Sequence, residues 1–156
     1  MRILVVYYSR DGHTRTIAQT LSTMLQCDRE EIIDLKNRKG IFGWLAAGFD
    51  AFRKRLTKIQ EPKYDPSVYD LIVIGTPNWA GMPAPAIRTY LNNNIGKIKN
   101  TAFFCTFGGS DSGKVFDELQ ALCQIKPKAL LSVKASDVEN NTFMDKIQSF
   151  VQQIKS

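Results

Sequence analysis

Short apolar runs alternate with amphipathic helical patterns along the whole chain of 156 residues, and this alternation restricts the fold more than any other feature. Five runs are typical of strands, at residues 3–8, 30–35, 71–75, 102–107 and 129–133, and the run 30–35 alternates apolar with acidic residues as an edge strand would. Five segments have helical periodicity, at residues 13–26, 42–59, 84–92, 114–124 and 142–154. Strands that alternate with helices are typical of βαβ units and a parallel sheet. The sequence therefore predicts a single domain over residues 1–156, a three-layer, doubly wound α/β fold with a five-stranded parallel sheet.

The composition is that of an ordinary globular protein, with 44% hydrophobic and 23% charged residues, which excludes disordered and fibrous classes. The cysteines, Cys27, Cys105 and Cys123, form no CxxC pair and no zinc-ligand spacing, so buried thiols and a reducing compartment are expected. The N-terminal apolar run is too short for a signal peptide, and no stretch approaches the roughly 18 apolar residues of a membrane span. We therefore expect a cytoplasmic protein without a membrane span.

The net charge of +6 is concentrated in one segment. Residues 36–63 contain eight Lys and Arg residues and two acidic ones, whereas the rest of the chain contains thirteen of each. Apolar residues at steps of three and four predict a helix over 42–59 that packs its apolar face against the sheet rather than on a membrane. No nucleic-acid motif accompanies the charge, so nucleic acid is not an expected partner. The exposed cations would steer an acidic redox partner or a phosphorylated nicotinamide donor, and they are Arg53, Lys54, Arg55 and Lys58.

The functional loops are expected at the carboxyl ends of the strands, because ligands of doubly wound sheets bind where the strand order reverses. Loop 1 connects the first strand to a helix and reads Ser9-Arg10-Asp11-Gly12-His13-Thr14. Hydroxyl side chains, a glycine and the amides of a helix N-terminus suit an anion. The loop has neither the Gly-Lys-Ser/Thr ending of a Walker loop nor a GxGxxG pattern. A single phosphomonoester is therefore favoured over a triphosphate or a dinucleotide.

The segment around loop 1 resembles the flavodoxin signature at every defined position: Val5-Val6-Tyr7-Tyr8-Ser9-Arg10-Asp11-Gly12-His13-Thr14-Arg15-Thr16-Ile17-Ala18-Gln19-Thr20-Leu21. These positions are the strand end, the hydroxyl residue, the small residue, the threonine, the alanine and the closing aliphatic residue. The resemblance implies FMN as the cofactor. It also implies a flavodoxin-like sheet with the strand order 2-1-3-4-5, in which FMN lies at the switch point.

Two further loops extend the resemblance. Loop 2, Gly75-Thr76-Pro77-Asn78-Trp79-Ala80-Gly81-Met82-Pro83, is similar to the flavodoxin loop whose aromatic residue lies against the isoalloxazine ring. Loop 3, Phe107-Gly108-Gly109-Ser110-Asp111-Ser112-Gly113, resembles the loop whose backbone donors meet the pyrimidine edge of the flavin. The cofactor-binding residues that the resemblance implies are Ser9, Arg10, Gly12, His13, Thr14, Thr76, Pro77, Asn78, Trp79, Ala80, Gly81, Phe107, Gly108, Gly109, Ser110, Asp111 and Gly113.

Several of these residues also have purely structural interpretations. The hydroxyls of Ser9 and Thr14 suit the capping of a helix. Trp79 could belong to the core, and Arg10 and His13 could be ordinary surface residues. No side chain is a convincing general acid, base or nucleophile, and no spacing suits a metal, so neither catalytic residues nor metal ligands are predicted.

Three functions follow from the resemblance. The first is a flavodoxin-type electron carrier between redox proteins, and the second is an FMN-dependent NAD(P)H oxidoreductase acting on quinones or similar acceptors. The third is a sensor or binding module without turnover. The basic charge departs from typical carrier flavodoxins, and so does loop 3, which contains no aromatic residue. One flavin face would then stay open unless Trp44 or Met82 covers it. We predict the carrier and keep the reductase as the alternative.

Overall fold

A parallel sheet of five strands forms the centre of the computed structural model, which describes residues 1–109 and 113–156. The strands are β1 (Ile3–Tyr7), β2 (Asp28–Glu31), β3 (Leu71–Trp79), β5 (Thr101–Phe107) and β6 (Leu130–Lys134). Their order is β2-β1-β3-β5-β6, and the two-residue strand β4 (Met82–Pro83) pairs antiparallel with the end of β3. Apart from the short β4, this is the predicted order 2-1-3-4-5, which is confirmed.

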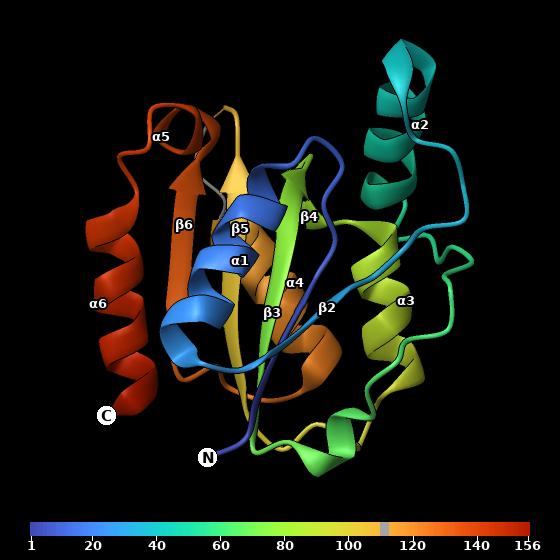
Figure 1. The fold of residues 1–156 in the computed structure, drawn as a ribbon. Coiled ribbons are helices and arrows are strands. Elements are labelled where there is room, and N and C mark those ends of the chain that lie inside the picture. The colour runs from blue at the N-terminus through green and yellow to red at the C-terminus, as the bar shows by residue number, and fades with distance from the viewer. Residues whose placement is uncertain (110–112) are drawn as a thin grey trace.

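Helices cover both faces of the sheet, as Figure 1 shows. Helices α1 (His13–Leu25) and α6 (Met144–Lys155) pack on one face, and α3 (Pro85–Asn93) and α4 (Gly113–Cys123) pack on the other. The short α5 (Ala135–Glu139) follows β6 and contacts α1. Helix α2 (Gly40–Phe52) lies above α3 in Figure 1 and extends beyond the carboxyl ends of the strands, while a 3-10 turn, Pro66–Val68, precedes β3. The three layers are thus confirmed.

The core follows the period of two that a strand imposes on its side chains. Ile3, Val5 and Tyr7 of β1 join the cluster under α1 and α6, whereas Leu4 and Val6 join the cluster under α3 and α4. Every residue of β1 is buried, as expected for a parallel sheet with both faces covered. Because the strands are parallel, β1, β3 and β5 end at the same edge of the sheet.

The second strand differs from the prediction. It was expected over residues 30–35, but β2 spans Asp28–Glu31 and pairs with Leu4–Tyr7 of β1. The chain then leaves the sheet, and a bridge joins Asp34 to Ile59 in the antiparallel sense. The carboxylate of Glu30 is buried because it accepts hydrogen bonds from the amides of Lys63 and Tyr64. Residues 33–35 of the predicted strand therefore pair with the segment 58–60 and not with β1.

The predicted packing of the helix over 42–59 is wrong. The helix ends at Phe52, and Lys54 adopts the left-handed conformation with φ 54°. Its buried face consists of small residues and one acid, Gly43, Ala47, Asp50 and Ala51. A Cβ on Gly43 would lie 2.3 Å from the carbonyl carbon of Arg38, so the helix packs closely against the segment before it. The large apolar residues of α2 consequently face solvent.

The three cysteines form no disulfide. Only Cys105 is fully buried, whereas Cys27 and Cys123 are partly buried, so the prediction of three buried thiols is correct for one of them. Burial is the main cause that raises the pKa of Cys27 to about 11 and that of Cys123 to about 12. Both thiols therefore stay protonated and unreactive near neutral pH.

Candidate functional site

Loop 1 is built around a glycine that forms the start of α1. Gly12 caps the helix with φ 98° and ψ −16°, a left-handed conformation that other residues resist. The hydroxyl oxygen of Ser9 accepts hydrogen bonds from the amides of Gly12 at 3.1 Å and Arg15 at 3.2 Å. Ser9 therefore has the structural role that capping predicts, and it fixes the curvature of the loop.

The first turn of α1 leaves backbone donors available. The amides of His13 and Thr14 have no acceptor among the described residues, and no acidic residue lies in this turn. Unpaired amides at a helix N-terminus, together with the helix dipole, favour an anion. The turn therefore offers two N–H groups to a negatively charged ligand.

A buried pair of hydroxyls joins loop 1 to the end of β5. The Oγ1 atoms of Thr14 and Thr106 lie 2.8 Å apart, and both residues are at most 5% exposed. Thr106 is absent from the predicted set. Its only signal in the sequence is its place at the end of a strand, one residue before Phe107. This bond sets the distance between loops 1 and 3.

Loop 2 is a hairpin rather than an irregular loop. Strand β3 continues to Trp79, and Asn78 and Trp79 pair with Pro83 and Met82 of β4. The two connecting residues, Ala80 and Gly81, have φ of 54° and 80°, which is typical of a tight two-residue hairpin turn.

Side-chain hydrogen bonds hold both ends of this β3–β4 hairpin. The Asn78 Oδ1 accepts from the Gly81 amide at 2.9 Å, and the Thr76 Oγ1 accepts from the Ala84 amide at 2.9 Å. The Thr76 hydroxyl also donates to the Pro77 carbonyl at 2.9 Å. The polar side chains predicted in this loop therefore build the hairpin that carries Trp79.

Trp79 presents a partly exposed ring at the carboxyl edge of the sheet. The Tyr8 ring lies edge-on to it, with centroids 5.5 Å apart and an interplanar angle of 85°. The guanidinium carbon of Arg38 lies 5.9 Å from the centre of the Trp79 ring. Burial is the main cause that raises the pKa of Tyr8 to about 12, so its hydroxyl is neutral. Tyr8 and Arg38 thus hold the Trp79 ring in place, and part of the ring surface stays accessible to a ligand.

Loop 3 approaches the hairpin from the other side. Phe107 is partly buried, Gly108 and Gly109 are exposed, and Gly113 begins α4. A Cβ on Gly81 would lie 3.2 Å from Cδ of Lys114, so the start of α4 lies against the hairpin turn. Lys114 is another residue that the sequence analysis missed. The predicted residues Ser110 and Asp111 lie outside the described residues.

The side chains of Arg10 and His13 have partners within the protein. Arg10 Nε donates to the Arg38 carbonyl at 2.8 Å, and its Nη2 donates to the Gly40 carbonyl at 3.2 Å. His13 Nε2 lies 3.1 Å from a carboxylate oxygen of Glu139. Arg10 therefore ties loop 1 to the start of α2, and His13 ties α1 to α5.

A buried ionic cluster lies behind Trp79. Arg38 is 3% exposed, and its Nε and Nη1 donate to Asp34 at 2.6 Å and Asp50 at 2.9 Å. Lys36 Nζ also contacts Asp50, at 2.6 Å. Burial alone would raise the pKa of Asp50, but hydrogen bonds from Lys36 and Arg38 outweigh it and lower that pKa. The cluster thus stays charged and fixes the segment between β2 and α2.

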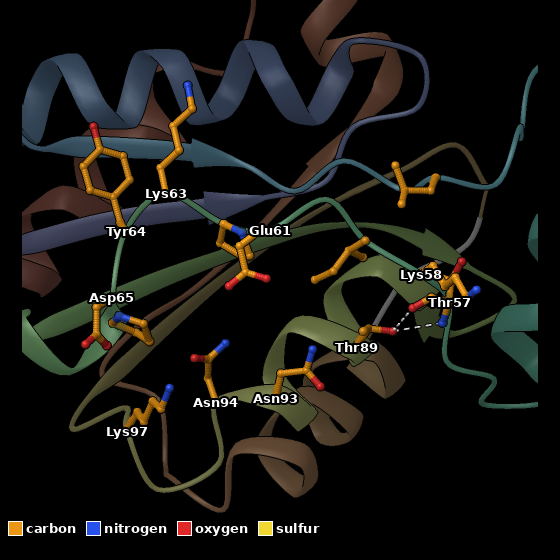
Figure 2. Close-up of a pocket in the computed structure, with 14 residues that line it drawn as sticks. Thr57, Lys58, Glu61, Lys63, Tyr64, Asp65, Thr89, Asn93, Asn94 and Lys97 are labelled. Atoms are coloured by element: carbon orange, nitrogen blue, oxygen red, sulfur yellow. Dashed lines mark hydrogen bonds between the residues drawn. The ribbon is translucent and has the colours of Figure 1, made fainter.

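A separate cavity of about 550 Å³ lies beside α3, and none of the predicted cofactor-binding residues lines it. Figure 2 shows polar side chains around it, including Lys63, Lys97 and Glu61. The Thr89 hydroxyl accepts from the Thr57 amide and donates to the Thr57 carbonyl, the bonds dashed in Figure 2. No residue lining this cavity has a buried side-chain polar atom without a partner among the described residues. We therefore place the candidate site at the carboxyl edge of the sheet.

No family model matches the chain, and no curated protein matches it. Solved structures do. A flavoprotein in complex with FMN from Lactobacillus acidophilus has a TM-score of 0.74 at 22% identity, over 89% of this chain and 97% of that one. Flavodoxin 1 from Bacillus cereus, in its oxidised form, has a TM-score of 0.57 at 18% identity, over 99% of this chain and 98% of that one.

A WrbA-like flavodoxin protein from Agrobacterium tumefaciens has a TM-score of 0.55 at 16% identity, over 97% of this chain and 98% of that one. Proteins named flavodoxin and WrbA-like thus occur among those of the same architecture. The sheet order, the helices on both faces and these matches together show that the chain has the flavodoxin-like fold.

Proposed function

We propose that the chain binds FMN without a covalent bond and transfers electrons between redox proteins. One observation carries the proposal. Two amides of α1 that have no acceptor among the described residues lie at the same edge of the sheet as the accessible ring of Trp79. This arrangement suits a ligand with a phosphate at one end and a flat ring at the other. The solved structure of a flavoprotein with this fold is an FMN complex.

Each part of the site would have a distinct task. The amides of His13 and Thr14 would bind the phosphate, and Trp79 would stack on the flavin ring. The backbone of Gly108 and Gly109 would meet the edge of the ring. Bound FMN supplies one-electron and two-electron transfer, and the protein supplies orientation and hydrogen bonds. The exposed cations Arg53 and Lys58 would attract an acidic protein partner.

One observation favours a second candidate, an FMN-dependent NAD(P)H oxidoreductase acting on quinones or similar acceptors. The described part of loop 3 contains two exposed glycines, Gly108 and Gly109, and the partly buried Phe116 of α4 packs against the core. Met82 is 7% exposed, so its side chain is held within the fold. An open flavin face would admit a nicotinamide or a quinone.

Titration with flavins tests the proposal directly. We expect FMN to bind at least about a hundredfold more tightly than riboflavin, because each amide-to-phosphate hydrogen bond contributes about 1.5–3 kcal/mol. Quenching of flavin fluorescence measures both dissociation constants. Equal affinity for the two flavins would exclude a phosphate site at α1, and the absence of FMN binding would refute the proposal.

The Trp79→Ala substitution is expected to weaken FMN binding by roughly tenfold to a hundredfold, because it removes the stacking surface. The matched control is Trp44→Ala, which removes the other tryptophan, on the exposed face of α2. Fluorescence titration of both variants measures the difference. If Trp44→Ala lowers the affinity and Trp79→Ala does not, the ring stacks elsewhere.

Nucleotide oxidation separates the two functions. A carrier is expected to oxidise NADPH and NADH only slowly in the presence of a quinone, whereas a reductase turns over. Gly108→Tyr is the matched variant, since nothing lies within 4 Å of a Cβ at that position. It is expected to suppress a reductase activity by covering the open face, and FMN titration of the variant shows separately how far binding itself changes. If the protein rapidly reduces a quinone with NADPH or NADH, and Gly108→Tyr abolishes this activity, the reductase is the function and the carrier proposal is rejected.

A further inference from the structure

Helix α2 exposes a continuous set of large apolar side chains, here called the α2 face. Their exposed fractions lie between 49% and 84%, and they are Ile41, Phe42, Trp44, Leu45, Phe49 and Phe52. Monomeric proteins rarely expose apolar patches of such extent without an interaction partner. The opposite side of the helix packs through glycine, alanine and Asp50, so the α2 face is the outer surface of a docked helix.

Cations border the α2 face at both ends. Lys39 precedes the helix and is exposed, and four more basic residues follow it. The guanidinium carbons of Arg53 and Arg55 lie 5.2 Å and 5.1 Å from the centre of the Phe49 ring, so the charges sit next to the apolar side chains. Residues 36–63 hold six more basic than acidic residues, a surplus equal to the net charge of the chain.

The combination of aromatic side chains and adjoining cations determines the kind of partner. A second copy of the chain would place the same cationic border opposite itself, which like-charge repulsion opposes. An anionic lipid surface complements both features, because Trp, Phe and Leu enter the boundary of headgroups and acyl chains while Lys and Arg meet the phosphates. Among the described residues no helix is long and apolar enough to cross a membrane, so α2 would lie in the interface.

We propose that the α2 face docks the protein on an anionic lipid surface. The inference rests on exposure and charge, independently of the proposed FMN function. Arg10 bonds the carbonyls of Arg38 and Gly40, so the start of α2 is tied to loop 1. Figure 1 shows α2 extending beyond the carboxyl ends of the strands. Docking through α2 would therefore bring the candidate site toward the lipid headgroups.

Sedimentation with vesicles tests this docking. Vesicles of equal parts phosphatidylglycerol and phosphatidylcholine are compared with vesicles of phosphatidylcholine alone, at low and high salt. We expect binding to the anionic vesicles that weakens with salt. In the Trp79→Phe background, Trp44 is the only tryptophan, and its emission is expected to shift to the blue on binding.

Two pairs of variants define the surface. The double variant Phe42→Gln, Phe52→Gln is expected to reduce vesicle binding at least tenfold. Its control is Ile95→Gln, which changes a 64% exposed apolar residue elsewhere and is expected to leave vesicle binding unchanged. The double variant Arg53→Gln, Lys58→Gln is expected to weaken vesicle binding about fivefold for each charge removed. Its control is the double variant Lys97→Gln, Lys99→Gln, which is expected to leave vesicle binding unchanged.

Three results would overturn the inference. The first is no binding to anionic vesicles at low salt, and the second is equal loss in the test and control variants. The third is a stable dimer in sedimentation equilibrium that the Phe42→Gln and Phe52→Gln pair dissociates, which would make the α2 face an interface between copies. FMN titration of the Phe42, Phe52, Arg53 and Lys58 variants, each in a chain that keeps Trp79, tests FMN binding separately, since none of these four residues is proposed to contact the flavin.

Discussion

The Arg38→Met substitution is expected to lower the free energy of unfolding by about 3–5 kcal/mol, because it leaves the buried carboxylate of Asp34 without its cation and removes one of the cations that contact Asp50. Arg38 bonds both Asp34 and Asp50, whose side chains are 2% and 7% exposed. Lys36 would still reach Asp50, but Asp34 would keep only the hydroxyl of Thr57 and the amide of Lys36. Urea denaturation measures the loss.

The matched control is Arg53→Met, which removes an exposed guanidinium and is expected to change stability by no more than about 0.5 kcal/mol. Equal losses in the two variants would contradict a structural role for the buried cluster. The pH dependence gives a second readout. Since the pKa of Asp50 is lowered in the folded state, its contribution is present above its ordinary value of 3.8 and is lost as the pH falls through the folded value. In Arg38→Met that pKa rises, so this loss is expected to begin at a higher pH.

The Gly75→Ala substitution is expected to destabilise the protein by about 3 kcal/mol, although alanine is otherwise preferred over glycine in a strand. A Cβ at Gly75 would lie 1.9 Å from Cζ of Phe104, the residue that faces it on β5. The Phe104 ring is fully buried, so it has no free space to occupy after the change. Thermal or urea unfolding measures the effect.

A double-mutant cycle identifies the cause. Gly75→Ala combined with Phe104→Leu is expected to lose less stability than the sum of the two single changes, because the smaller side chain makes room for the new methyl group. Gly48→Ala, where a Cβ meets nothing within 4 Å, is the control and should be neutral or stabilising. Additive effects of Gly75→Ala and Phe104→Leu would show that the contact with the ring is not the reason.

The central strands β1, β3 and β5 were predictable because most of their residues are buried between the two helical layers and are therefore apolar. The edge strand was not, since Glu30 is buried only through two amides contributed by residues more than thirty positions away. In α2, small and large residues both repeat at helical spacing, so periodicity alone cannot say which set faces inward. The pairing of Asp50 with Arg38 and the close packing of Gly43 determine that the small residues face inward, and both are tertiary contacts.

The candidate site shows the same division. Loop 1 and the tryptophan of loop 2 could be selected as site candidates from sequence patterns, because each pattern consists of one strand and the turn that follows it. Thr106 and Lys114 have no such pattern, yet they connect loops that are distant in the sequence. Tyr8 lies within the pattern of loop 1, but its contact with the indole of Trp79 is a tertiary one. Ser9 suited both capping and anion binding, and its hydroxyl accepts the hydrogen bonds of a cap.

The β3–β4 hairpin has a consequence for how such a site can change over time. Trp79 stands on a backbone whose turn and hydrogen bonds come from Asn78, Gly81 and Thr76, and none of these contacts uses the indole. The hairpin can therefore keep its turn and its hydrogen bonds when another side chain replaces Trp79, although the contacts of the indole with Tyr8 and Arg38 change. A lineage of such proteins could retune the electronic surroundings of its ligand through single codon changes, without passing through a misfolded intermediate.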